Sequence, residues 1–223
     1  MKKENTNKYA AISADIVSST SLSSEDIKKL QLQIKALLVK FEQYFNGFWG
    51  RLVKGDSIEC VMEHPSDALR VALMLKAFVK SFVPSEGEVD SKFKRYGLRL
   101  AIGVGTMRTV DKEIDMIDGE AIYLSGRALA DMSEKTSNSF QFVMNDDISR
   151  GAMRIIMIQL NQMINSATGR QCETLFYRLQ YCNDAQVAEK MGITRSGANN
   201  NLRNIGWSVV ESALDYYEQL DFN

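Results

Sequence analysis

Two aspartates carry the clearest capacity for chemistry in this sequence. Asp15 lies near the end of a run of small and β-branched apolar residues, and Asp56 follows Gly55 between two short β-rich runs. Magnesium and manganese ions prefer oxygen ligands and share them with substrate phosphates, so two carboxylates and a backbone carbonyl such as that of Ile16 suffice for a site. The competing interpretation is structural: Asp15 caps a turn through the serines that follow it, and Asp56 is a turn residue.

The elements around these aspartates decide whether they can meet. Residue alternation, helical periodicity and turn residues predict the order β-α-β-β-α-β with an extra α-β at the end. This order is typical of an α+β fold with a ferredoxin-like antiparallel sheet and helices on one face, in which the first strand lies beside the following hairpin. The predicted strands span residues 8–17, 48–53, 57–62, 98–105 and 140–144, and the predicted helices span residues 24–46, 65–82 and 120–133.

The chain changes character after Asn145, because no further strand pattern occurs. Periodicity predicts helices at residues 147–166, 170–181, 184–191, 195–204 and 207–220. We therefore predict two domains, an α+β domain at residues 1–145 and an all-α module at residues 146–223.

The stretch from Asp184 to Arg203 predicts a helix-turn-helix within that module. Gly192 supplies the tight turn, and Thr194 caps the second helix. The exposed side of this second helix carries residue types that contact bases or phosphates, namely Arg195, Ser196, Asn199, Asn200 and Arg203.

Charge limits how strongly this module can bind duplex DNA. Residues 190–210 contain three basic residues and no acidic one, although residues 146–223 hold seven Lys and Arg against nine Asp and Glu. Phosphate contacts supply most non-specific affinity, so useful DNA binding requires a dimer. The alternative is a helical protein-interaction tail.

Composition excludes several other classes of function. The formal net charge of −1 provides no global field that attracts nucleic acid, so any such site must be a local patch. Cys60, Cys172 and Cys182 lack close-pair spacing, and His64 is the single histidine, which speaks against zinc sites and histidine-based catalysis. No apolar run reaches bilayer length and the first residues lack a signal pattern, so we expect a cytoplasmic protein with no membrane partner.

Four segments resemble the motifs of class III nucleotidyl cyclases, in the same order along the chain. Residues 13–17 resemble the first metal-binding motif, and residues 53–57 resemble the Gly-Asp hairpin motif. Residues 102–105 resemble the strand before the nucleotide-specific segment, and residues 119–127 resemble the helix motif that ends in Arg. The resemblance implies Mg²⁺ or Mn²⁺ at Asp15, Ile16 and Asp56. It also implies a nucleoside triphosphate bound by Lys54, Asp118, Tyr123 and Arg127, with Arg127 catalytic in an active enzyme.

The departures from the cyclase motifs concern the contacts to the nucleotide. Tyr123 replaces the asparagine that orients the ribose, Leu52 replaces the lysine that reads the base, and Met116 replaces the base-reading aspartate. Lost hydrogen bonds of this kind cost orders of magnitude in rate. The sequence therefore predicts nucleotide sensing rather than turnover.

Nearly the whole chain resembles the SatD-like family more closely, because there the cyclase-like motifs precede a C-terminal helix-turn-helix. This resemblance implies the architecture more than the function. With the motifs above it leads to the prediction of a bacterial regulatory protein with a degenerate, metal-dependent nucleotide site and a DNA-binding tail, acting as a homodimer. Two alternatives remain open. One is an active cyclase or phosphodiester-processing enzyme that uses Asp15 and Asp56, with Arg127 acting across a dimer interface. The other is a tail that only binds protein.

Overall fold

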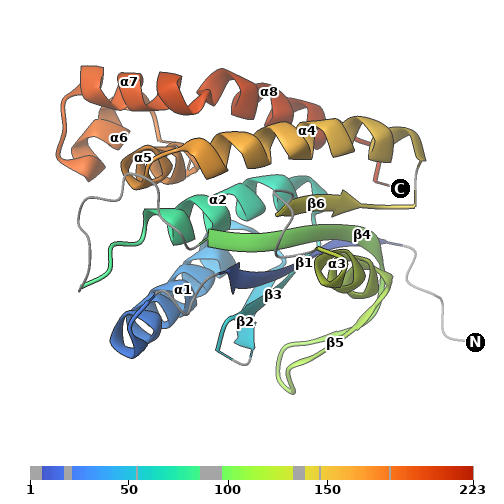
Figure 1. Ribbon diagram of the computed structural model, residues 1–223. Coiled ribbons are helices and arrows are strands. Elements are labelled where there is room, and N and C mark those ends of the chain that lie inside the picture. The colour runs from blue at the N-terminus through green and yellow to red at the C-terminus, as the bar shows by residue number, and fades with distance from the viewer. Residues whose placement is uncertain are drawn as a thin grey trace, which may run out of the picture.

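The computed structural model describes residues 7–17, 22–53, 55–85, 97–132, 139–145, 147–180 and 182–222. Within these residues the protein has the predicted mixed α+β fold, with one mostly antiparallel six-stranded sheet and eight α-helices (Figure 1). The strands are β1 Lys8–Val17, β2 Phe48–Val53, β3 Ser57–Met62, β4 Gly97–Asp111, β5 Met116–Gly119 and β6 Phe140–Val143. The helices are α1 Ser24–Tyr44, α2 Ala68–Ser81, α3 Glu120–Ala130, α4 Asp147–Ser166, α5 Gly169–Leu179, α6 Asp184–Met191, α7 Arg195–Ile205 and α8 Trp207–Glu218.

The sheet has the strand order β2-β3-β1-β4-β5, and β6 pairs with β4 in parallel. β1 lies between β3 and β4, antiparallel to both. Successive side chains of a strand point to opposite faces. Ile12 and Ala14 accordingly join the main core with residues of α1 and α2, whereas Ala11 packs with Ala121 of α3. Both faces of β1 are therefore covered.

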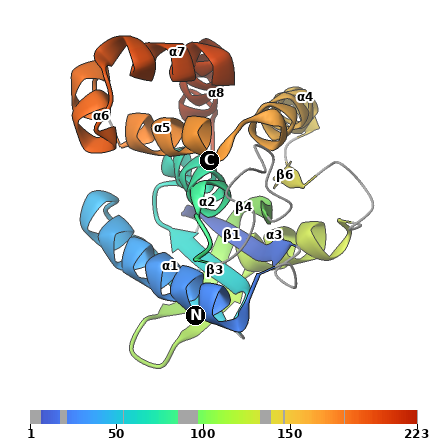
Figure 2. The ribbon, with the colours of Figure 1, turned by 60° about the vertical axis from the view of Figure 1, so that its left-hand side comes forward.

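The position of α3 corrects the expectation that the helices cover one face of the sheet. α1 and α2 lie on one side of the sheet and α3 lies on the other (Figure 2). Small residues on β1 and β4 admit a helix on this second face, and the hydroxyl oxygens of Ser13 and Ser125 lie 2.8 Å apart there. Asp15 follows Ser13 by two residues and shares its face.

β5 is an element that the sequence prediction missed. The predicted strand stopped at Gly105, but β4 continues to Asp111 and turns back into β5, with a register shift between Met107 and Thr109. The Asp111 carboxylate accepts hydrogen bonds from the backbone N–H groups of Glu113 and Ile114 in the turn. Polar side chains cover much of this hairpin, so its alternation is weak even though its strands are paired.

The C-terminal helices share the main core of the sheet domain. α5 packs on α2, and Tyr217 of α8 meets the ring of Phe142 edge-on at 5.6 Å between centroids. Arg70 of α2 also forms an ion pair with Glu218 of α8 at 3.0 Å. The predicted boundary at 145/146 lies just before α4, and independent folding of the two parts stays a prediction. No helix within the described ranges is long and apolar enough to span a membrane.

Candidate functional site

The β1–β3 ladder brings Asp15 and Asp56 to neighbouring positions. Asp15 pairs with Ser57, and the Ile16 N–H donates to the Asp56 carbonyl at 3.2 Å. Gly55 supplies the positive φ of 86° that the hairpin turn requires. The three predicted metal-site residues therefore lie at one end of the central strand.

The carboxylate of Asp15 is held by a residue that the sequence prediction did not single out. Arg99 lies directly opposite Asp15 in the β1–β4 register and donates from Nε to Oδ1 at 3.0 Å and from Nη2 to Oδ2 at 2.5 Å. Its Nη1 also donates to the Met132 carbonyl, just beyond α3. The Asp15 and Arg99 side chains are 23% and 18% exposed. This bidentate, partly buried pair occupies both carboxylate oxygens with a fixed positive charge.

Asp56 has different surroundings. Its side chain is exposed and forms no hydrogen bond or ion pair with the described residues. Asp56 lines a cavity of about 220 Å³ with Ile16 and the first turns of α1, on the side of the sheet opposite Asp15. In the part of the chain that is described, no cluster of three His, Cys, Asp or Glu side chains is suited to a metal ion. As arranged, these residues do not fit a divalent cation, because a cation at Asp15 must first displace Arg99.

The predicted nucleotide-binding residues form a separate cluster at the start of α3. Tyr123 donates its hydroxyl to Asp118 at 2.7 Å, and Arg108 forms an ion pair with Asp118 at 3.0 Å. The hydrogen bond to Asp118 raises the pKa of Tyr123, because ionisation would place two negative charges together. Arg127 lies one turn further along α3, exposed and without a side-chain hydrogen bond or ion pair to the described residues. Lys54 lies outside the described residues.

This cluster and Asp15 lie at opposite ends of α3. Arg99 contacts the Met132 carbonyl just beyond the end of α3. Asp118 and Tyr123 lie at the start of this helix, and a helix of 11 residues is about 16 Å long. Asp15 therefore does not share a pocket with Asp118 and Tyr123 within one chain. A site that contains all three would need a second copy of the protein.

The sequence does carry a signal for Arg99, because it is a charged residue inside the predicted strand 98–105 and a charge in a buried strand requires a partner. Arg108 carries no such signal, since its side chain is 71% exposed. The sequence alone does not show that the partner of Arg99 is Asp15, because the register of β1 against β4 selects it.

The predicted helix-turn-helix residues lie on α6 and α7. Asn183 caps α6 in a capping box with Gln186, and Gly192 ends the helix with a left-handed φ of 62°. Thr194 then caps α7 by accepting from the Gly197 N–H at 3.1 Å. The result is a pair of short helices joined by a tight turn.

The two faces of α7 differ sharply in burial. Ala198, Leu202 and Ile205 are buried, and Asn201 donates to Thr174 of α5 at 3.0 Å. α7 lies at the outer edge of the molecule, away from the sheet (Figures 1 and 2). The five predicted contact residues are all exposed, namely Arg195, Ser196, Asn199, Asn200 and Arg203.

Arg99→Ala tests the role of the pair at Asp15. Removing the guanidinium should lower the free energy of unfolding by about 1–3 kcal/mol, because a partly buried carboxylate loses both of the hydrogen bonds that Arg99 donates to it. The freed carboxylate should also give a rise in melting temperature on addition of Mn²⁺ that is larger than in the wild type. Thermal unfolding with and without Mn²⁺ measures both effects.

Arg108→Ala is the matched control, because Arg108 lies on the same strand and also pairs with an aspartate. It should leave the response to Mn²⁺ at the wild-type level. Equal Mn²⁺ responses of the wild type and Arg99→Ala would show that Arg99 does not keep cations from Asp15.

Comparisons with known proteins give only weak structural similarity. No protein-family model and no curated protein matches the chain. Among solved structures, a bacterial light-regulated adenylyl cyclase is similar over 60% of this chain and 74% of its own, at 11% identity and a TM-score of 0.37. A similarity this low assigns no residue and no activity to the protein.

Proposed function

We propose that this protein binds duplex DNA through α7, the second helix of a helix-turn-helix. The observation that carries this proposal is the outward polar face of α7, whose opposite face is buried against α5 and α6. Arg195, Asn199 and Arg203 follow one another at intervals of four residues, so they form one stripe. Arginine and asparagine side chains are the types that contact phosphates and base edges.

The local charge supports the same proposal. No acidic residue interrupts residues 190–210, so the exposed face of α7 is free of negative charge along its length. The basic residues are few, and phosphate contacts provide most of the affinity. Binding by one copy is therefore weak, and we propose that a homodimer is the DNA-binding form.

We propose that the sheet domain is a cyclase-like, SatD-like sensing domain without turnover. The order β2-β3-β1-β4 supports a ferredoxin-like plan, and Asp15 and Asp56 occupy neighbouring positions on it. The guanidinium of Arg99 takes the place of a cation at Asp15. A nucleotide at Asp118, Tyr123 and Arg127 would then be held by side chains alone.

The alternative of an active enzyme has one supporting observation, the backbone adjacency of Asp15 and Asp56, although the cavity at Asp56 lies on the other side of the sheet. The bidentate Arg99 pair opposes it, because a cation at Asp15 would lie against the positive charge of the guanidinium. Such an enzyme would convert a nucleoside triphosphate, with Mn²⁺, into a cyclic nucleotide and pyrophosphate, and Asp15→Ala would abolish this product. A tail that binds only protein is the third possibility, and the DNA measurement below distinguishes it.

Fluorescence-anisotropy titration of labelled duplex DNA tests the proposed function. Arg195→Ala and Arg203→Ala should each weaken binding to all sequences and lower the salt slope by about 1. Asn199→Ala should mainly reduce the preference between sequences.

Arg154→Ala is the matched control, because it removes an exposed arginine from α4 rather than α7. It should bind DNA as the wild type does. Absence of binding at low salt, or an equal loss in Arg154→Ala and Arg203→Ala, would reject DNA binding by α7.

A further inference from the structure

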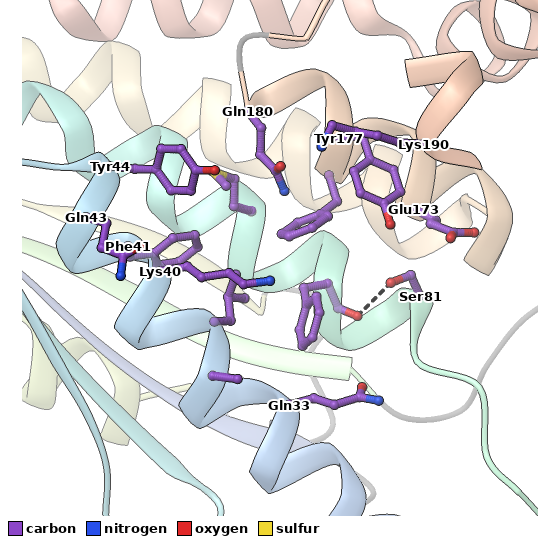
Figure 3. Close-up of a pocket in the computed structure, with 15 residues that line it drawn as sticks. Gln33, Lys40, Phe41, Gln43, Tyr44, Ser81, Glu173, Tyr177, Gln180 and Lys190 are labelled. Atoms are coloured by element: carbon purple, nitrogen blue, oxygen red, sulfur yellow. Dashed lines mark hydrogen bonds between the residues drawn. The ribbon is translucent and has the colours of Figure 1, made fainter. Parts of the chain in front are cut away.

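A pocket of about 730 Å³ lies where the sheet domain meets the C-terminal helices. Its lining residues come from α1 and α2 on one side, and from α5 with its following residue Gln180 and the end of α6 on the other (Figure 3). Pockets for small molecules commonly have volumes of about 300–1,000 Å³. The candidate site described above uses none of these residues.

Aromatic rings form the apolar part of this pocket. Phe78 of α2 and Phe176 of α5 lie 5.3 Å apart between ring centroids, and Tyr177 lies 5.6 Å from Phe176. Phe41 of α1 and Met74 of α2 also line the pocket and are buried. Such surfaces bind flat rings by stacking and edge contacts.

The charged residues at the pocket leave an excess of positive charge. Apart from tyrosines, the ionisable lining residues are Lys40, Glu173 and Lys190. Glu173 is already compensated, since it accepts from Arg170 at 2.8 Å. The Lys190 ammonium lies 5.7 Å from the Tyr177 ring centroid, and Lys40 forms no hydrogen bond or ion pair with the described residues.

The polar groups converge on the open space from both sides. Figure 3 shows Lys40 and Tyr44 on α1 facing Tyr177 and Gln180 across the pocket. The lysine offers a charge, and the glutamine amide offers both a donor and an acceptor. An anion would thus meet Lys40, while a ring would meet the aromatic wall.

We propose that this pocket binds a small planar aromatic molecule with one anionic group. The ring system packs against Phe78, Phe176 and Tyr177, and the anion lies at Lys40 with Lys190 nearby. The ligand contacts α1 on one side, and α5 and α6 on the other. It therefore bridges the sheet domain and α6, the helix that precedes α7. The site does not depend on DNA binding by α7.

Two matched dyes test this proposal in the full chain. The anionic dye 1-anilinonaphthalene-8-sulfonate and its uncharged counterpart N-phenyl-1-naphthylamine differ only in the sulfonate, and both fluoresce more strongly in apolar surroundings. The wild type should bind the anionic dye saturably and more tightly than the neutral one. Lys40→Met should weaken the anionic dye about fivefold, the size of one exposed ionic contact, and leave the neutral dye unchanged.

Two further variants separate the pocket from the rest of the surface. Ala36 lines the pocket from an exposed position of α1, so Ala36→Trp fills the space without disturbing the core and should abolish saturable binding of both dyes. Lys35→Met removes a neighbouring exposed charge that does not line the pocket and should bind both dyes as the wild type does.

Several results would overturn the proposal. They are the absence of saturable binding, unchanged dye binding in a folded Ala36→Trp, equal affinity of the wild type for the two dyes, or equal effects of Lys35→Met and Lys40→Met. No DNA is present in this experiment. A protein that binds the anionic dye in this pocket but does not bind DNA therefore keeps the site and rejects only the proposed function.

Discussion

Gly103→Ala is expected to lower the free energy of unfolding by about 3 kcal/mol, the upper end of the usual cost of overpacking. A Cβ at residue 103 meets the carbonyl oxygen of Ala121, and it lies 2.5 Å from the backbone nitrogen of Ser125. Both atoms belong to the backbone of α3, so no side-chain rotation relieves the overlap. The whole helix must move away from β4, and urea unfolding followed by circular dichroism measures the cost.

Gly97→Ala provides the matched control on the same strand. A Cβ at residue 97 has no atom within 4 Å, so this substitution should change stability by a few tenths of a kcal/mol at most. Equal destabilisation by the two variants would contradict the close approach of α3 at Gly103. The contact matters for the candidate site, because α3 carries Tyr123 and Arg127 and its end places the Met132 carbonyl beside Arg99.

Stability is also expected to rise steeply as the pH increases above about 7, because of Lys76. This α2 residue is 2% exposed, and its ammonium donates to the carbonyls of Leu98 and Ser139 and to the Ser139 hydroxyl. Burial, aided by the nearby charge of Lys80, lowers the pKa of Lys76 to about 7, while Cys172 acts weakly in the opposite direction. At alkaline pH the buried amine is neutral and its desolvation cost is relieved.

The sign of this effect follows from the number of bound protons. Between pH 7 and the ordinary lysine pKa of 10.5, the unfolded chain keeps a proton that the folded chain has released. The free energy of unfolding therefore increases with pH in this window, by up to roughly 1.4 kcal/mol per pH unit. Below about pH 7 both states are protonated and this contribution no longer changes.

Urea unfolding at about pH 7 and about pH 9 measures the pH slope. Lys76→Met should remove most of it, and the slope that remains should come partly from Lys80, whose pKa burial also lowers. The exposed Lys35→Met should keep the full slope. Identical slopes in the wild type and Lys76→Met would mean that Lys76 stays charged through this range.

The sequence by itself determined the local features of this protein. α1 begins at Ser24 as expected, because Ser23 accepts from the Asp26 N–H at 3.1 Å. The turn between α6 and α7 follows from Gly192 and Thr194 in the same way. Caps, turn residues and periodicity act over a few residues, so they can be read without the rest of the fold.

The hairpin that places Asp56 beside β1 was also predictable. The order of elements fixed which strands adjoin, and Gly55 marked the turn. The extension of β4 and the existence of β5 were not predictable from the sequence, because a backbone ladder holds that hairpin while its side chains are largely polar. Strands are recognised in a sequence by the alternation of apolar and polar side chains, and this hairpin has little of it.

Only the tertiary structure decided the partners of the candidate site. Arg99 meets Asp15 from 84 residues away because the β1–β4 register places them opposite each other, and a shift of one residue would turn Arg99 to the other face. The pocket beside Lys40 likewise depends on how α5 and α6 pack over α1 and α2. Local sequence fixes which elements form, whereas register and helix packing are long-range and fix which side chains meet.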